Sequence, residues 1–596
     1  MLAVQILIDG FAISALYGLG AVGFTLMFGV SGVLNLAHGG IMVVSAVTAW
    51  VVAGEYGAGS YLGALAGVVA GIVTSFATYF LVVRPIQRSR AVPDVEKEVF
   101  VLTGTLLWGI MLQEAVAYFY TDNPKTVRPL IEGVTVLSGV RTPTNEYLIA
   151  AICWLTIGLL WLLVNRTKAG KALLAASINP RGLTLLGFEL SRIYLLVWAI
   201  YGVLAGVAGV LLATFLGTSS AQAGQLTASA FSIVVLGGLA VSPVRCWPPI
   251  SWVIWKPARP IWSRPRSAPC RCSSCWFWLF ICGLKACWGG ARMFASRQLW
   301  AAIVVVVLLA ALPLWLSSYL LGVLTIGYYF GVFSMAWDLL FGFAGEVNFG
   351  PTFLTGLGAY AAGLLNAQGV DLPLCLLAGA GAAVIGGLAL ALPALRLSGP
   401  YFGLVTLVAV LLLQQCIIIF AGVTGGEIGL TMNDILSIDA DTNYWTALGF
   451  MTVSGIILFG LSRSAVGLIL QASGQDAVEA AALGFNITKH KLAAFGISAF
   501  FSGLAGAMMV FYLGTASVGI VVDIAIGVQV IIAAILGGRR TILGPAVGAV
   551  LLILAGEALR PLGQLSTFVV SAVALIVILF LPGGLLGRVL RPRGRA

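Results

Sequence analysis

Long apolar stretches separated by short polar segments run along the whole chain. Clear cases cover residues 11–29, 61–82, 195–215, 301–316, 401–421 and 568–581. A run of roughly 20 apolar residues can cross a bilayer as an α-helix. Inside lipid the backbone must satisfy its own hydrogen bonds, which a helix does. The pattern therefore predicts an all-α integral membrane protein.

Composition and charge support this prediction. Hydrophobic residues make up 60% of the 596 residues and charged residues only 9%, whereas soluble domains carry about 25% charged residues. The net charge of +11 does not indicate nucleic-acid binding, because the basic residues lie in short segments between the apolar runs. Such segments face the cytoplasm in most membrane proteins, so we expect them and the C-terminus to be cytoplasmic. They include Arg84, Arg88, Lys168, Lys171, Arg463, Lys489, Arg539, Arg540 and Arg588.

The chain contains an internal duplication. Phe28-Gly29-x-x-Gly32-x-x-Asn35 recurs 313 residues later as Phe341-Gly342-x-x-Gly345-x-x-Asn348. Further on, glycines at 170, 187, 206, 209 and 217 recur at a constant offset of 297. The basic segments occupy equivalent places, so we expect two homologous, parallel halves with a pathway along their shared axis. The run lengths suggest about eight to ten transmembrane helices in each half, with the first half at 1–240 and the second at 293–596.

Residues 241–292 form an anomalous segment between the halves. This segment holds six of the nine Cys and seven of the sixteen Trp, and it is dense in Pro and Arg. The spacing Cys270-x-Cys272-x-x-Cys275 is not that of a standard zinc pair, so we predict no metal site there.

We hypothesise that a shifted reading frame produced this segment. Reading the codons after Leu239 one base earlier permits an ending Leu-Arg-Pro-Glu-Gly-Leu-Leu-Gly-Arg, which resembles the second half's ending at 581–588. Met293 would then start a separate protein. DNA sequencing across codons 236–295 tests this hypothesis, and an intact frame without slippage would contradict it.

Two segments, 167–192 and 464–489, are amphipathic and rich in small residues, and a membrane helix follows each at once. A short helix of this kind can dock into a groove on a soluble partner and pass motion to the membrane part. An ordinary solvated loop is the alternative for either segment alone, but two copies in register favour docking.

At these segments the chain resembles the permeases of ATP-binding-cassette (ABC) importers. Glu479-Ala480-Ala481-Ala482-Leu483-Gly484 is close to their coupling-loop pattern, whereas the first-half copy, 181–187, lacks the acidic residue. More narrowly, 32–39 resembles the first permease of the branched-chain amino acid importer family. Residues 342–350 and 424–430 resemble the second permease, although Glu346 and Pro351 stand where Gln and a small residue or His are more usual.

The resemblance implies partners and a place in the cell. It implies two cytoplasmic ATP-binding subunits, a periplasmic or lipid-anchored solute-binding protein, and the bacterial inner membrane. It also assigns ATPase-coupling roles to residues in both loops, namely Gly170, Asn179, Arg181, Gly187, Gly467, Glu479, Ala480 and Gly484.

Polar residues within the apolar runs are candidates for the translocation pathway, because they are costly in lipid unless paired or wet. Asn35 and Asn348 are equivalent, and each follows a Gly that could unwind a helix. The alternatives are a cytoplasmic turn between two helices at Asn35 and Asn348, and helix-bridging contacts by Gln113, Glu114, Gln414 and Gln415. Asp338 precedes the second motif and is expected to pair with a basic group. The full set of pathway candidates is Asn35, His38, Gln113, Glu114, Glu346, Asn348, Gln414 and Gln415.

These observations favour transport over catalysis. The sequence has no Gly-x-x-x-x-Gly-Lys-Ser/Thr loop for ATP phosphates, and no catalytic set, cofactor motif or metal motif stands out. We predict a permease for branched-chain amino acids or related small polar solutes, powered by separate ATPases. Urea or short amides, an ion-coupled secondary transporter and a non-transporting scaffold remain alternatives.

Overall fold

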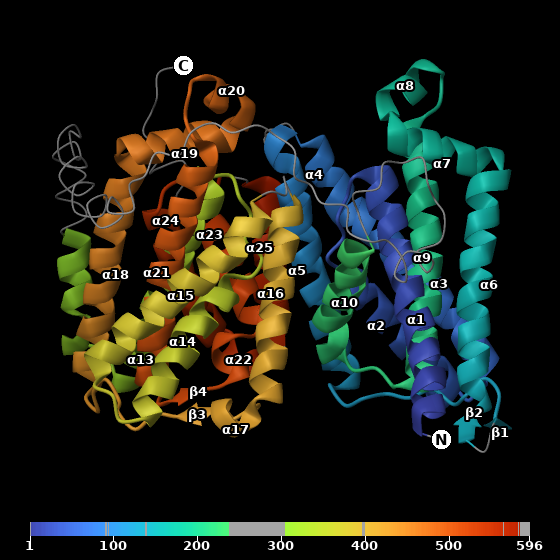
Figure 1. Ribbon diagram of the computed structural model, residues 1–596, viewed down its shortest axis with the longest axis horizontal. Coiled ribbons are helices and arrows are strands. Elements are labelled where there is room, and N and C mark those ends of the chain that lie inside the picture. Colours follow the sequence, from blue (N-terminus) through green and yellow to red (C-terminus); the bar gives the residue numbers. More distant parts are fainter. Residues whose placement is uncertain are drawn as a thin grey trace.

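The computed structural model describes residues 2–89, 92, 94–137, 140–237, 304–395, 400–563, 565–581 and 583–584. Helices dominate this part of the chain (Figure 1). The strands described are short antiparallel pairs, β1 (Val134–Leu137) with β2 (Val140–Pro143) and β3 (Leu430–Thr431) with β4 (Thr515–Ala516). The all-α membrane fold predicted from the sequence is confirmed. The anomalous segment 241–292 lies outside the described residues.

The first half begins with three helices that run back and forth along the molecule. They are α1 (Leu2–Ser31), α2 (His38–Trp50) and α3 (Ser60–Thr78), the last extended by α4 (Arg84–Arg88). Next come α5 (Asp94–Tyr120), α6 (Thr144–Arg166), the two short helices α7 (Lys168–Ile178) and α8 (Pro180–Leu185), then α9 (Leu190–Phe215) and α10 (Ala223–Leu236).

The second half repeats this order after an additional helix, Val304–Leu314. The repeat consists of α13 (Ser318–Asp338), α14 (Pro351–Ala367), α15 (Leu372–Ala394), α16 (Pro400–Ile419), α18 (Ala440–Arg463), α19 (Ala465–Gln475), α20 (Ala477–Ala482) and α21 (Ile487–Leu513). The short α17 (Ala421–Thr424) and α22 (Val518–Val521) interrupt it. The half ends with α23 (Ile524–Gly537), α24 (Leu543–Ala558) and α25 (Leu565–Phe580).

Twelve helices of the described residues are long and apolar enough to cross a membrane, six in each half, and three shorter apolar helices accompany them in the second half. Taking both kinds together, the described part of the second half has nine apolar helices, within the eight to ten expected from run lengths. The described part of the first half has six, and 238–303 lie outside the described residues.

Each half is built around a tight three-helix packing unit. In the first half α9 packs against α2 and α3, and in the second half α21 packs against α14 and α15. The helices approach closely at equivalent glycines, because a Cβ on Gly209 would lie 2.3 Å from the Met42 carbonyl oxygen, and one on Gly506 would lie 2.4 Å from that of Thr355. Small residues permit such approaches in membrane proteins.

The halves meet through helices that lie in the middle of the molecule (Figure 1). The last helix, α25, packs along α5 of the first half, and α10 contacts α16 of the second. Both pairs of short helices, α7–α8 and α19–α20, lie at the same end of the molecule, opposite the marked N-terminus. The parallel orientation of the halves follows from this placement.

We expect Gly209→Ala and Gly506→Ala to destabilise the protein. The added methyl meets a backbone carbonyl, so a helix must shift, and such overpacking costs about 1–3 kcal/mol. Gly449→Ala in α18 is the matched control, because nothing lies within 4 Å of its Cβ position. Thermal unfolding in detergent should show lower midpoint temperatures for the first two variants than for the unaltered chain. The midpoint of the control should not change.

Candidate functional site

The first helix break lies between α1 and α2 and is held by buried polar side chains. Asn35 accepts a hydrogen bond from the Ala37 N–H at 3.0 Å and donates to the Tyr201 hydroxyl at 3.1 Å. The Nδ1 atom of His38 lies 2.8 Å from the same hydroxyl. Asn35 and His38 are fully buried, so their side chains pack inside the protein and do not face solvent. Tyr201 of α9, which the sequence analysis did not single out, organises the break.

The second break, between α13 and α14, uses the same construction. Asn348 accepts from the Gly350 N–H at 2.8 Å, as Asn35 does from Ala37. The N–H groups of Leu36 and Phe349 donate to equivalent threonines, Thr105 at 3.2 Å and Thr406 at 3.0 Å. Their constant offset of 301 could have revealed this pair in the sequence. Asn35, His38 and Asn348 thus hold the breaks together, and a contact with solute stays a prediction for them.

The second break also carries a buried ion pair. Lys491 Nζ lies 2.5 Å from Glu346 Oε1, and the two side chains are only 14% and 11% exposed. Next to this pair, Gly345 packs on α19, since a Cβ on Gly345 would lie 2.8 Å from the Gly474 Cα. Glu346, predicted as a pathway residue, therefore lies where the break contacts a short helix of the coupling loop.

The remaining pathway candidates lie on α5 and α16, the helices in the middle of the molecule (Figure 1). Gln113 and Glu114 of α5 are partly exposed, and so is Gln414 of α16, whereas Gln415 is exposed. Gln414 donates to the Val522 carbonyl at 3.2 Å. Partial exposure on these central helices agrees with a place beside a pathway between the halves.

The two coupling loops have matching local architecture. Thr167 and Ser464 accept N-cap hydrogen bonds from Gly170 and Gly467 at the starts of α7 and α19. A Cβ at either glycine would lie within 2.3 Å of a carbonyl oxygen of the preceding helix. The predicted loop residues Gly170 and Gly467 are therefore pressed against α6 and α18.

The second short helix of each loop begins with its own cap. Asn179 accepts from the Gly182 N–H at 2.9 Å, and Asp476 accepts from the N–H groups of Val478 and Glu479 at 2.7 and 3.0 Å. A side-chain acceptor at this position satisfies free N–H groups of the first turn. The predicted residues Arg181 and Glu479 are exposed on these helices, whereas Ala480 is buried.

The tips of both loops expose apolar side chains. Leu186 is 75% exposed and its counterpart Leu483 is 74% exposed, and Phe188 and Phe485 also face solvent. Gly187 and Gly484 end the short helices with φ of +83° and +90°, a conformation that favours glycine. Equivalent exposed apolar side chains therefore lie at the tips of both loops, at one end of the molecule.

Asp338 interacts with the charge of Arg540, which agrees with the expected pairing with a basic group. Its carboxylate accepts backbone N–H groups of Arg540, Thr541 and Ile542 at 2.9, 3.2 and 3.1 Å. This fixes the loop between α23 and α24, where Arg540 and Ile542 have positive φ. In the same loop the Arg539 guanidinium lies 4.6 Å from the ring centroid of Phe100 in the first half, a cation–π contact between the halves.

Comparison with known proteins agrees with the duplicated architecture. A model of the branched-chain amino acid transport system permease component family matches residues 6–254 and again 319–582. The chain is 28% identical over 254 residues to the high-affinity branched-chain amino acid transport system permease protein BraD of Pseudomonas aeruginosa, covering 40% of this chain and 80% of the relative.

Two permease proteins of Escherichia coli K12 are also similar to this chain. The permease protein LivH of the high-affinity branched-chain amino acid transport system is 27% identical over 260 residues, which is 40% of this chain and 80% of LivH. The permease protein LivM of the same system is 26% identical over 320 residues, which is 48% of this chain and 74% of LivM. With two family matches along most of its length, the chain belongs to the branched-chain amino acid transport system permease component family.

Proposed function

We propose that this chain forms the translocation pathway of an ABC importer for branched-chain amino acids. Two cytoplasmic ATP-binding subunits dock on the α7–α8 and α19–α20 loops, and a periplasmic or lipid-anchored binding protein delivers the solute. The observation that carries the proposal is the pair of equivalent, exposed apolar tips at one end of the molecule. One partner on each tip agrees with two identical or similar ATPases.

The orientation follows from charge. Basic residues such as Lys168 and Arg463 flank the coupling loops, and such segments remain in the cytoplasm. The chain then lies in the bacterial inner membrane with the coupling loops and the C-terminus inside. Import follows from the proposed delivery of solute by a binding protein on the side opposite the coupling loops.

The central helices favour a solute without net charge. Gln113, Gln414 and Gln415 offer amide donors and acceptors, and Glu114 is the one ionisable group among these four positions. Amides can hydrogen-bond an ammonium or a carboxylate without imposing a charge preference. A zwitterionic amino acid with an apolar side chain fits such a route, and the relatives' names point to the branched-chain class.

Competition for uptake tests the solute class. Proteoliposomes with the chain, its ATPases and the binding protein should take up labelled leucine, and excess isoleucine or valine should inhibit at least tenfold more strongly than urea, acetamide or lysine. Equal or stronger inhibition by urea or acetamide would contradict the amino-acid assignment and favour the amide alternative.

A further inference from the structure

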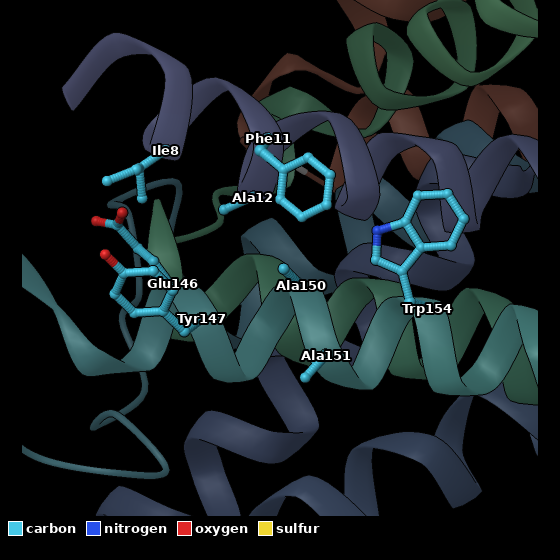
Figure 2. A pocket seen from close by; sticks show the side chains of 8 residues that line it. All are labelled: Ile8, Phe11, Ala12, Glu146, Tyr147, Ala150, Ala151 and Trp154. Carbon is cyan, nitrogen blue, oxygen red and sulfur yellow. The ribbon is translucent and has the colours of Figure 1, made fainter. Parts of the chain in front are cut away.

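A crevice opens between the beginnings of α1 and α6, on the outer side of the first half (Figure 2). It has a volume of about 540 Å³, within the range of roughly 300–1,000 Å³ typical of small-molecule sites. Phe11 and Ala12 of α1 form one wall, and Ala150, Ala151 and Trp154 of α6 form the other. The site lies at the end of α6 away from the coupling loops.

The walls of the crevice are apolar and face the bilayer. The rings of Phe11 and Trp154 stack with centroids 6.3 Å apart, and small alanine side chains line the crevice next to them. Farther along α6, Leu155, Leu159 and Leu162 are more than half exposed. Because α6 crosses the membrane with these side chains outward, hydrocarbon chains of the lipid surround the crevice.

A buried carboxyl group stands at one end of this apolar space. Glu146 is only 5% exposed, and its Oε2 atom has no hydrogen-bond partner among the described residues. Asp9 of α1 lies close enough to interact with this carboxyl group. Two carboxyl groups can share a hydrogen bond when at least one of them carries a proton. An ammonium group next to them would favour their ionised forms and donate to their oxygens.

The second half shows what covers the equivalent surface. Tyr147 of α6 corresponds to Tyr444 of α18 at the offset of 297. The hydroxyl of Tyr444 donates to the Leu309 carbonyl at 2.7 Å, and the Trp445 indole donates to the Ala310 carbonyl at 3.1 Å. The apolar helix Val304–Leu314 therefore lies along α18. The position equivalent to Glu146 is Asn443, whose amide donates to the Ser437 carbonyl at 2.8 Å.

The helix Val304–Leu314 lies on the surface of the second half, because Val304, Val305, Val307 and Leu308 are more than half exposed. Among the described elements, α6 packs instead against α1, α7, α9 and β2. A single acyl chain is narrower than a helix and matches the apolar walls of the crevice. Asn443 is an uncharged amide, and its Oδ1, like Glu146 Oε2, has no partner among the described residues, whereas Glu146 and Asp9 are both carboxyl groups that can carry negative charge.

We propose that this crevice binds an amine-bearing phospholipid, phosphatidylethanolamine. Its ammonium group donates to the Glu146–Asp9 pair at the end of α6, and one acyl chain lies between α1 and α6 against Phe11 and Trp154. The lipid covers the surface of α6 that corresponds to the surface of α18 covered by the helix Val304–Leu314 in the second half. This site is separate from the helix breaks and from the coupling loops.

Native mass spectrometry of the full chain tests the site with palmitoyl-oleoyl phosphatidylethanolamine, phosphatidylcholine and phosphatidylglycerol. We expect retention of one phosphatidylethanolamine at least fivefold above the other two lipids. Glu146→Gln should remove this preference, and Ala151→Trp should fill the crevice and reduce binding of that lipid. Leu159→Trp, on the exposed face of α6, is the matched control and should bind as the unaltered chain does.

A photoreactive phosphatidylethanolamine with a diazirine in its acyl chain locates the lipid. Cross-links are expected in peptides containing Phe11 or Ala150–Trp154. Equal retention of the three lipids, an unchanged preference in Glu146→Gln, or cross-linking of Ala151 to another membrane protein in place of lipid would overturn the proposal. None of these outcomes depends on uptake, so the proposed transport function stands or fails separately.

Discussion

Replacing Leu186 and Leu483 together by Asp is expected to abolish association with the ATP-binding subunits. Both side chains are about three-quarters exposed at the tips of equivalent loops, where they would be buried on docking. Loss of an apolar anchor commonly costs 2 kcal/mol or more, and an unpaired carboxylate in the groove adds to this cost. About 2.7 kcal/mol corresponds to a hundredfold loss of affinity. Co-purification of the ATPases with the variant measures the effect.

The control is a double variant with the same substitution at the other end of the molecule. Ile428 and Ile438 are more than 90% exposed and lie next to α17 and β3, away from the coupling loops (Figure 1). Ile428→Asp/Ile438→Asp should retain the ATPases. Leucine positions serve better than Gly187 or Gly484, because the positive φ of these glycines adds backbone strain to any substitution. Full ATPase recovery with the leucine variant would exclude docking through these tips.

Lys491→Met is expected to destabilise the second half by about 3–5 kcal/mol, since removing one partner leaves a buried charge uncompensated. Glu346 is only 8% exposed, and in the variant its carboxylate would remain at the break between α13 and α14 without the Lys491 ammonium. Denaturation in detergent, followed by circular dichroism, measures the change. The double variant Glu346→Gln/Lys491→Met should recover most of the loss, because it leaves no unpaired charge.

A surface pair provides the comparison for this double-variant cycle. Glu189 and Arg192 form an ion pair at 2.7 Å, but their side chains are 64% and 82% exposed. Exposed pairs contribute about 0–1 kcal/mol, so Glu189→Gln should change stability little. If Lys491→Met is no more destabilising than Glu189→Gln, the Glu346–Lys491 pair does not stabilise the break.

Much of the architecture could be predicted from sequence because it follows from local composition and from the duplication. The apolar runs mark α1, α3, α9, α16 and α25, and the repeated glycines mark the packing of α9 and α21. The duplication also revealed the coupling loops. The same short segment occurs once in each half, next to basic residues and directly before a membrane helix.

Contacts between distant residues could not be predicted in this way. Tyr201 joins the first break across 166 positions of sequence, and its second-half counterpart is Ser498, so no repeat exposes its role. Asp338 was expected to pair with a basic group, and Arg540 supplies that charge, but the three backbone N–H groups that the loop 540–542 donates to Asp338 were not expected. Backbone donors leave no trace in residue identity, which hides such a site from sequence reasoning.

The crevice between α1 and α6 also could not be predicted from the sequence. Glu146 lies at the start of an apolar run, where a charged residue is typical of a helix end at the membrane surface. Only the packing of α1 on α6 shows that it is buried next to a cavity. The comparison with α18 then becomes informative, because it shows which apolar element fills the equivalent place in the second half.

The most direct test of the account is uptake of labelled leucine into proteoliposomes that contain this chain, its two ATP-binding subunits and the solute-binding protein. Uptake should require ATP and all partners, and should be lost in the Leu186→Asp/Leu483→Asp variant while a proton or sodium gradient has no effect. Leucine uptake without ATP, driven by such a gradient, would contradict the account.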